Sequence, residues 1–393
     1  MNIKILIFID WFYPAFKAGG PVKSVFNLIQ NLKDEVDFFI VTGDRDIDGT
    51  LVNELMNQYE NVAIEDAAPL ELDQWIEKDG YKVIYLSLER QKTSVYKEMV
   101  KEIHPDWAYY NSLFSKNFTL KPYRALKKLG VKQMIAPRGM LGKGALSIKP
   151  MKKKVFLAGS KSLLFDKGTY WHATTQQEFR EIEQEGLAEA KMIRIASNLA
   201  TPLQPDYKTF RKSDGQIRLF FLSRISKKKN LLFLLEILKK LPELTNLSLD
   251  IYGPIEKDGH WEQCKPIVDQ DPRVSYSGEI HPQAIPEMIS KYHFLVLPTL
   301  HENYGHVIAE TLSQGRPVLI SDQTPWRELE ERQIGFDLSL ANREEWEERI
   351  TQIYEMKDEA YQKMCAAAFE YAKQNIVNSS LIEASMALFA LDE

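Results

Sequence analysis

The sequence has little cysteine and no long hydrophobic run. Its 393 residues include two cysteines, Cys264 and Cys365, which form no CxxC pair and no zinc-binding set. This scarcity excludes a disulfide-stabilised scaffold and favours a reducing cytosol. The apolar run Ile5–Ile9 ends at Asp10, whereas a membrane-spanning helix needs about 20 such residues. The run is also too short for the core of a signal peptide, so we expect a cytoplasmic protein.

An excess of positive charge is also missing. The chain has 50 Lys and Arg against 55 Asp and Glu, for a net charge of −5 at pH 7. This balance disfavours a general nucleic-acid binder, and we expect no nucleic acid as a partner. Hydrophobic residues make up 44% and charged residues 27% of the chain, which is typical of a soluble globular protein. At roughly 100–200 residues per domain, this length predicts two or three domains.

The pattern that is present is an alternation of short apolar, β-branched segments with segments of helical spacing. Strands are predicted at residues 3–9, 36–42, 81–86, 107–110, 131–136, 170–174, 217–222, 247–252, 273–276, 294–297 and 317–321. Asn, Thr, Pro and Gly residues between 195 and 215 predict a linker. The fold class is therefore α/β, with two doubly wound Rossmann-like lobes facing across a cleft. We expect lobes at residues 1–200 and 201–377, with a last helix, 378–393, packed back on the first lobe.

Ligands of such sheets bind at the carboxyl ends of strands, so the loops there hold the candidate site. Gly19 and Gly20 follow the first strand, where glycine lets backbone N–H groups approach an anion at a helix start. The loop is not GxGxxG, which disfavours a dinucleotide cofactor. A flexible turn is the alternative interpretation.

A basic loop, residues 223–230, follows the first strand of the second series. Arg224 and Lys229 there suit a diphosphate, because arginine can grip two oxygens and lysine supplies a point charge. A solvated lysine cluster is the alternative, but cations are disfavoured at a helix N-terminus unless an anion compensates them.

The third candidate is the segment from His301 to Glu310. Glu302 is expected in a loop and Glu310 about two turns inside the next helix, which gives a pocket two carboxylates that accept hydrogen bonds from sugar hydroxyls. Gly305 would let backbone N–H groups face a ligand. His301-Glu302 with His306 is one residue too long for the zinc motif HExxH, and no metal is expected.

Together these residues resemble the retaining GT-B glycosyltransferases of family 4, in the branch common among bacterial surface and capsular polysaccharide enzymes. The similarity covers most of the chain and is densest from 217 to 330. It is carried by Ser223-Arg224-Ile225 with Lys229-Asn230, Glu302 with Glu310, Gly315-Arg316-Pro317-Val318, His172-Ala173-Thr174-Thr175 with Glu178, Pro137-Arg138-Gly139-Met140-Leu141, and Asp322-Gln323-Thr324-Pro325-Trp326.

The resemblance implies a retaining, metal-independent hexosyltransferase without a cofactor, whose donor is a nucleotide-diphosphate sugar. Arg224 and Lys229 would hold the pyrophosphate, Glu302 the donor hexose and Glu310 the ribose. Further donor contacts are implied for Gly19, Gly20, Gly278, Ile280, Asn303, Tyr304, Gly305, His306 and Val307.

Some positions depart from the pattern of this family. Ser223 and Asn230 stand where glycines are usual, and Gln323-Thr324 replaces a glycine pair. Arg138 stands where many members have a histidine, so it would meet donor phosphate or an anionic acceptor. The role of His172 is similarly open.

The acceptor is expected to be a lipid-linked or polysaccharide intermediate. Lys149, Lys152, Lys153 and Lys154 lie beside an apolar stretch and predict peripheral contact with the inner face of the membrane; a solvated basic helix is the alternative. Asp44-Arg45-Asp46 is the nearest match to a metal-binding DxD motif, and we interpret it as a solvated loop. The alternative functions are a sugar-nucleotide epimerase of the same fold and a non-catalytic two-lobed sugar-binding protein.

Overall fold

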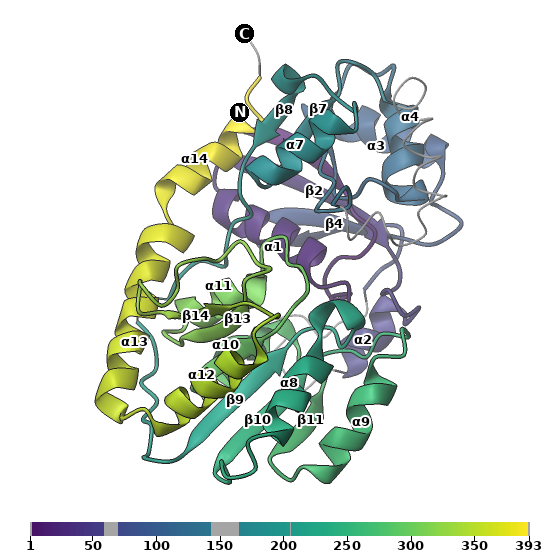
Figure 1. The fold of residues 1–393 in the computed structure, drawn as a ribbon. Coiled ribbons are helices and arrows are strands. Elements are labelled where there is room, and N and C mark those ends of the chain that lie inside the picture. The colour runs from purple at the N-terminus through teal and green to yellow at the C-terminus, as the bar shows by residue number, and fades with distance from the viewer. Residues whose placement is uncertain (1, 59–69, 143–164, 205, 392–393) are drawn as a thin grey trace. The chain divides into compact units, whose positions relative to one another are not determined.

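The computed structural model describes residues 2–58, 70–142, 165–204 and 206–391. The chain divides into two compact units (Figure 1). The first unit comprises Met1–Pro202 and Ser379–Glu393, and the second comprises Leu203–Asn378. The basic residues 149 and 152–154 fall outside the described ranges.

The first unit is built on an eight-stranded sheet in the order β3-β4-β2-β1-β5-β6-β7-β8. All neighbours pair in parallel except β3 and β4, which are antiparallel. Its strands are β1 (Ile3–Phe8), β2 (Val36–Gly43), β3 (Trp75–Lys78), β4 (Tyr81–Leu86), β5 (Trp107–Tyr110), β6 (Lys132–Ile135), β7 (Tyr170–Ala173) and β8 (Ile193–Ile195).

Helices cover both faces of this sheet, which is why its central strands are apolar throughout. One core cluster joins α1 and α14 to one face, and a second joins α3, α4 and α7 to the other. The helices are α1 (Gly20–Leu32), α2 (Val52–Gln58), α3 (Thr93–Ile103), the π-helix η1 (Lys116–Leu120), α4 (Lys121–Leu126), α7 (Gln176–Gln184), the 3-10 helix η3 (Ala190–Met192) and α14 (Ser379–Ala387).

The last helix therefore belongs to the first unit, although it follows the second unit in sequence. Beyond α14, Leu388 and Phe389 are 1% and 0% exposed. The Trp107 indole donates to the Phe389 carbonyl at 2.9 Å. Arg194 donates to the Leu388 carbonyl at 2.7 Å and lies over the Tyr170 ring.

The second unit is built on a six-stranded, parallel sheet in the order β11-β10-β9-β12-β13-β14. Its strands are β9 (Ile217–Leu222), β10 (Leu247–Tyr252), β11 (Val274–Gly278), β12 (Phe294–Leu297), β13 (Val318–Ser321) and β14 (Gly335–Leu338). Its helices are η4 (Lys227–Lys229), α8 (Leu231–Lys239), α9 (Trp261–Gln270), η5 (Pro282–Ala284), α10 (Ile285–Ile289), α11 (His306–Ser313), α12 (Arg343–Glu355), α13 (Asp358–Tyr371) and the π-helix η6 (Ala372–Ile376).

Both sheets reverse their strand order beside their first strand. β1 lies between β2 and β5, and β9 lies between β10 and β12. The predicted α/β class with two doubly wound sheets is confirmed. Such switch points open a crevice at the carboxyl ends of the strands, where ligands of these folds bind.

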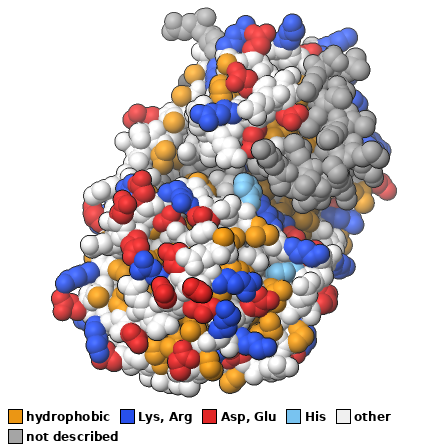
Figure 2. All heavy atoms as spheres, in the orientation of Figure 1, with side chains coloured by type: hydrophobic (Ala, Val, Ile, Leu, Met, Phe, Trp, Pro, Cys, Tyr) orange, Lys and Arg blue, Asp and Glu red, His pale blue; other side chains and the backbone are white. Residues whose placement is uncertain are grey.

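Acidic and basic side chains are interspersed over the visible face of the second unit (Figure 2). Within the described ranges, no helix combines the length and the apolar character that crossing a bilayer requires.

Candidate functional site

Three loops meet at the switch point of the second sheet. They follow β9, β12 and β13 and are tied by hydrogen bonds through their backbones. Leu300 N donates to the Lys228 carbonyl at 2.8 Å, and Glu302 N donates to the Gln323 carbonyl at 3.0 Å. The Asn230 amide also reaches the Pro298 carbonyl at 3.1 Å. The basic loop and the Glu302 loop, far apart in sequence, are therefore neighbours, as the topology predicts.

Two ion pairs join the basic loop to the loops beside it. Arg224 pairs with Glu256 in the loop after β10, and Lys229 pairs with Glu302 in the loop after β12. Lys228 interacts electrostatically with all four of these charges. Three cations thus face two carboxylates, and the cluster keeps one positive charge in excess. Such a cluster favours an anionic ligand that can replace a carboxylate as the partner of arginine or lysine.

The Lys229–Glu302 pair is the better shielded of the two. Its side chains are 11% and 15% exposed, against 36% and 35% for Arg224 and Glu256. Burial alone would raise the pKa of Glu302, but the charge and hydrogen bond of Lys229, together with Lys228 and His306, hold that pKa below its usual value. Glu302 is therefore an anion near neutral pH and accepts rather than donates hydrogen bonds.

The second glutamate lies closer to the start of its helix than the sequence suggests. Gly305 adopts φ 82° and caps α11, which begins at His306. Glu310 therefore lies about one turn inside α11 instead of two, since a turn takes 3.6 residues. Its side chain is half-buried.

An aromatic group packs beside this helix start. The Tyr304 ring lies 4.9 Å from the His306 ring and 5.7 Å from Trp326. The Trp326 indole donates to the Tyr304 carbonyl. Trp326 lies in the loop after β13, so this contact fixes the backbone next to Gly305 from a third strand. Asn303 and Val307 are half-buried on either side of these residues.

Gly278 closes β11 with φ 79°, and its carbonyl accepts a hydrogen bond from Gly253 N at 2.8 Å. Gly253 follows β10 with φ 130°, and a Cβ there would lie 1.9 Å from the Ser223 carbonyl oxygen. Only glycine lets the loops after β9 and β10 approach so closely. Ile280 is half-buried two residues beyond Gly278.

In the first unit, Gly19 and Gly20 begin α1 at the carboxyl end of β1. Gly19 has φ 72° and ψ −120°, and a Cβ on either glycine would meet open space. The preceding Lys17 is held twice by the loop after β2. Its backbone N–H donates to Asp46 at 3.1 Å, and its ammonium pairs with Asp48 at 2.8 Å. The lysine hydrogen bond holds the pKa of Asp48 at about 2 although partial burial opposes it.

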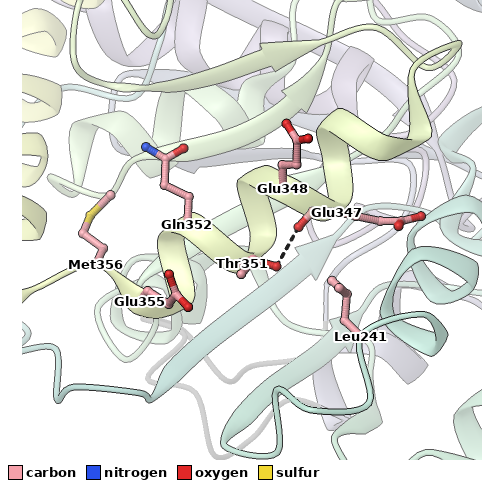
Figure 3. A pocket seen from close by; sticks show the side chains of 7 residues that line it. All are labelled: Leu241, Glu347, Glu348, Thr351, Gln352, Glu355 and Met356. Atoms are coloured by element: carbon pink, nitrogen blue, oxygen red, sulfur yellow. Dashed lines mark hydrogen bonds between the residues drawn. The ribbon is translucent and has the colours of Figure 1, made fainter.

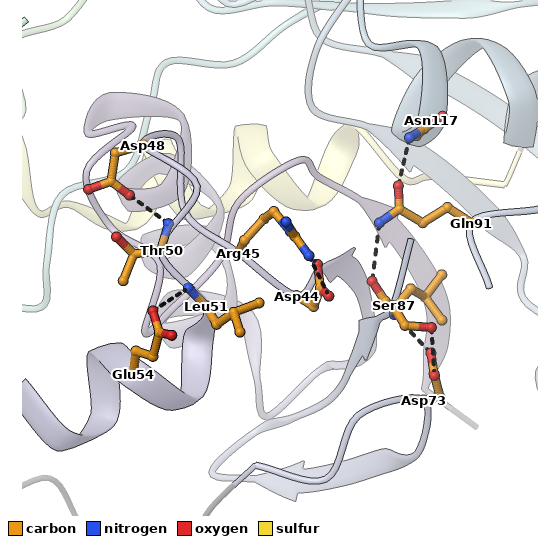
Figure 4. A network of polar contacts seen from close by, with 11 residues as sticks. Asp44, Arg45, Asp48, Thr50, Leu51, Glu54, Asp73, Ser87, Gln91 and Asn117 are labelled. Atoms are coloured by element: carbon orange, nitrogen blue, oxygen red, sulfur yellow. Dashed lines mark hydrogen bonds and ion pairs between the residues drawn. The ribbon is translucent and has the colours of Figure 1, made fainter. Parts of the chain in front are cut away.

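Our interpretation of the Asp44-Arg45-Asp46 loop as solvated is wrong. Asp44 and Asp46 are 5% and 2% exposed. Asp44 pairs with Arg45 at 3.0 Å, and Asp46 accepts the N–H of Ile47 at 2.6 Å. Figure 4 shows this loop with its turn from Asp48 to Leu51. These carboxylates are used to order the loop, which sequence spacing alone does not reveal.

Arg138 and His172, whose roles the sequence leaves open, come together in the first unit. Both contact the hydroxyl of Tyr109, Arg138 at 2.8 Å and His172 at 2.7 Å. Tyr109 is a buried residue of β5 that sequence analysis did not single out, because an aromatic in a buried strand has the pattern of a core residue.

Two other motif residues have structural contacts. Arg316 is fully buried and donates to main-chain carbonyls, among them Tyr292 at 3.0 Å and Lys208 at 2.6 Å. The buried Glu178 carboxylate accepts from Thr174 N at 2.8 Å and from Gly139 N at 2.5 Å. Glu256 is the charged partner that sequence analysis missed; its only signal is a position shortly after a strand.

A surface hollow of about 530 Å³ lies apart from these loops. Figure 3 shows it along α12, lined by Glu347, Glu348, Gln352 and Glu355 with Leu241 opposite. None of the predicted site residues lines this hollow. Its carboxylates would repel a diphosphate, so the loops at the switch point remain the candidate site.

Residues 205–374 match the family model described as glycosyl transferases group 1. The predicted donor residues from Arg224 to Glu310 all lie inside the matched range. Together with the fold, the match supports a glycosyltransferase. No curated protein matches the chain.

Solved structures resemble the whole chain and not the matched domain alone. Anabaena HepE in complex with UDP and glucose has a TM-score of 0.67 at 16% identity, over 98% of each chain. Sucrose-phosphate synthase from Thermosynechococcus elongatus has a TM-score of 0.70 at 14% identity, over 99% of this chain and 98% of that one. A Staphylococcus aureus TarM mutant with fondaparinux, alpha-GlcNAc-glycerol and UDP has a TM-score of 0.68 at 14% identity, over 99% and 100%. The expected GT-B fold is confirmed.

Proposed function

We propose that the protein is a retaining, metal-independent glycosyltransferase of family 4 that moves a hexose from a nucleotide-diphosphate sugar to a hydroxyl group. The observation that carries the proposal is the cluster of Arg224, Lys229 and Glu302 at the switch point of the second sheet. The structures of HepE and TarM contain UDP, which supports a nucleotide donor for a chain of this fold.

The chemistry requires stabilisation of a leaving diphosphate. Arg224 and Lys229 are fixed cations, and fixed charges aimed at developing negative charge are among the largest contributions to catalysis. In the free protein each cation is paired with a carboxylate. A diphosphate would take the place of these carboxylates, and Glu302 would then be free to accept hydrogen bonds from the hexose. Cations held in this way can supply the charge that a divalent metal supplies in other transferases.

Donor contacts are proposed for the remaining residues at the ends of the strands. Glu310 would bind the ribose hydroxyls, and the backbone of residues 303–307 would support the sugar and the phosphate. Gly278 and Ile280 would hold the base. Gly19 and Gly20 in the first unit would contact phosphate or acceptor. Glycine at positions 19 and 278 supports this assignment, since a Cβ at either position would meet open space and a ligand can approach the backbone closely there.

The acceptor is proposed to be a lipid-linked or polysaccharide intermediate of cell-surface glycan synthesis. The complex of TarM with alpha-GlcNAc-glycerol supports a glycan acceptor for this fold. Peripheral contact with the inner face of the membrane through residues 149 and 152–154 is part of the same proposal.

The direct test is incubation of the purified protein with a panel of nucleotide-diphosphate sugars, with and without EDTA. We expect slow release of a nucleoside diphosphate from one donor, unchanged by EDTA, and an anomeric configuration that NMR of the transfer product shows to be retained. An isomerised sugar would instead indicate the epimerase, and binding without turnover the sugar-binding protein. Loss of activity in EDTA would contradict metal independence.

The substitution Arg224→Ala tests the site itself. Loss of one preorganised charge costs on the order of 3–4 kcal/mol of transition-state stabilisation, so turnover should fall at least about 100-fold. Stability should change by about 1 kcal/mol or less, since the Arg224–Glu256 pair is partly exposed. Lys227→Ala removes an exposed charge from the same loop and is the matched control. Equal losses in both variants would mean that Arg224 has no specific role.

A further inference from the structure

The first unit holds an arginine, Arg138, whose position is fixed by hydrogen bonds but which forms no ion pair with the described residues. Arg138 follows β6 in the left-handed conformation, with φ 55°, which costs a residue other than glycine about 1–2 kcal/mol. Its guanidinium donates to the Asn111 side-chain oxygen at 2.7 Å, to the Tyr109 hydroxyl at 2.8 Å and to the Asn198 side-chain oxygen. All three acceptors are neutral.

Within the described residues, no carboxylate lies at ion-pair distance from Arg138. Glu178 contacts the neighbouring Gly139, and its carboxylate is taken up by the backbone N–H groups of Gly139 and Thr174 and by the Thr174 hydroxyl. Arg138 is only partly exposed. A partly buried cation without a counter-ion is unfavourable, so such a site favours an anion from outside the protein.

The contacts behind Arg138 have a defined direction. His172 is 3% exposed, and its Nε2 lies 2.8 Å from the Ala196 carbonyl. A carbonyl only accepts, so Nε2 carries the proton and Nδ1 must accept from the Tyr109 hydroxyl at 2.7 Å. The Tyr109 oxygen is then left to accept from Arg138. Arg138 thus donates to Tyr109, Tyr109 donates to His172, and His172 donates to the Ala196 carbonyl. These hydrogen bonds fix the orientation of the guanidinium.

A guanidinium has five N–H donors, and the described residues occupy three of them, through Asn111, Tyr109 and Asn198. Two remain for a ligand. Two N–H groups on a planar, permanently charged fork match two oxygens of a phosphate group. A neutral sugar hydroxyl would satisfy the hydrogen bonds but would leave the charge uncompensated.

We infer that Arg138 binds a phosphate oxyanion in the first unit, with Tyr109 and His172 as positioning residues that aim it. The inference deepens the proposed function, because the phosphate belongs either to the donor diphosphate or to an anionic acceptor. It is a second anion contact, made by a different unit from the one that carries Arg224.

The probe is inorganic pyrophosphate, titrated calorimetrically into the full chain. Arg138→Gln should weaken its binding at least about tenfold, while the control Arg180→Gln, an exposed arginine on the nearby α7, should not. Arg138→Lys keeps the positive charge but loses the paired N–H groups of the guanidinium, so its affinity for pyrophosphate should be intermediate. Thermal unfolding checks that each variant is folded.

The same titration in an Arg224→Gln background distinguishes the two sources. One pyrophosphate per chain, weakened by either substitution, assigns Arg138 to the donor diphosphate. Two per chain, each lost with one arginine, assigns it to a separate anionic acceptor. The inference is overturned if Arg138→Gln leaves the affinity and the stoichiometry of pyrophosphate unchanged, both in the wild-type chain and in the Arg224→Gln chain. Because no turnover is measured, failure to use any nucleotide sugar would affect the proposed function and leave this result standing.

Tyr109→Phe tests the positioning role. Loss of the hydroxyl should weaken pyrophosphate binding several-fold while Arg138 keeps its charge. In the Arg138→Gln background the same substitution should have no further effect, because the two residues act on one contact. Equal effects in both backgrounds would mean that Tyr109 acts on the fold alone, and would remove the positioning role.

Discussion

At the scale of single residues, charges in this protein are defined by their partners as much as by their position in a motif. Lys229 and Glu302 belong to separate motifs, and in the fold they pair with each other. Arg316, part of another motif, is buried among carbonyl groups. Arg138 has only neutral hydrogen-bond partners in the part of the chain that the structure describes. An arginine in a sequence motif can thus be a ligand contact or a framework residue, and its acceptors distinguish the two.

His172 provides a test of burial at this scale. Burial, together with the nearby Arg138, lowers the pKa of His172 to about 3, although the hydrogen bond to Ala196 opposes this. The unfolded chain has an ordinary histidine pKa near 6.5. Between these values the unfolded state binds one more proton, so stability falls as pH falls.

We expect the unfolding free energy of the first unit to decline below about pH 6.5. In His172→Gln that decline should be shallower by about 1.4 kcal/mol per pH unit. Urea titrations at several pH values between 4.5 and 6.5, followed by tryptophan fluorescence and compared between the wild-type chain and His172→Gln, measure this slope. Equal slopes in the two proteins would contradict the assignment of a neutral, buried His172.

At the scale of elements, loops after parallel strands form the site because the sheet brings their starting points together. The loops after β9 and β10 come into close backbone contact at Gly253. The loops after β12 and β13 are joined by the hydrogen bond from the Trp326 indole to the Tyr304 carbonyl. The start of α11 depends on one backbone conformation, that of Gly305. A Cβ on this residue would lie 2.8 Å from Ile308 Cδ1 and 3.2 Å from Glu302 Cγ.

Gly305→Ala should therefore combine backbone strain with a steric clash. Gly259 has a similar φ of 79°, but its Cβ would meet open space, so Gly259→Ala carries the strain alone. We expect Gly259→Ala to lower the stability of the second unit by about 1–2 kcal/mol, and Gly305→Ala to lower it by roughly 1 kcal/mol more. Chemical unfolding of both variants gives the difference. Equal losses of stability in the two variants would mean that the side chains of Ile308 and Glu302 move aside without destabilising the second unit.

At the scale of the whole molecule, the chain returns to its first unit after completing the second. Phe389 contacts Trp107 and Tyr109, with ring centroids 6.1 and 5.8 Å apart. The core of the first unit is thus completed by residues that follow the second unit in sequence.

Phe389→Ala should destabilise the first unit by about 3–5 kcal/mol, the usual cost of truncating a buried phenylalanine. Leu391 is 49% exposed, and Leu391→Ala should change stability by less than about 0.5 kcal/mol. Thermal unfolding, with proteolysis to show which unit opens first, distinguishes the two. A stable Phe389→Ala variant would mean that the C-terminal segment is dispensable for the first core.

The sequence by itself determined the alternation of strands and helices and the two-unit α/β class, because apolar runs and helical periodicity are local properties. Five strands have the predicted bounds: β4, β5, β9, β10 and β12. β3, β8 and β14 were missed. These edge strands show no continuous apolar run, since charged or glycine residues interrupt each of them. The candidate residues Arg224, Lys229 and Glu302 were also within reach of sequence analysis.

Only the tertiary structure decided which charges are paired. Three of the contacts join segments that are far apart in sequence: Arg224 with Glu256, Asp46 with Lys17, and Arg138 through Tyr109 with His172. The start of α11 at His306 depends instead on one backbone conformation, that of Gly305. Local patterns carry no information on such contacts. The electrostatic energy of a group depends on the distance to its partners and on its exposure to water, and both are fixed only when the sheets form.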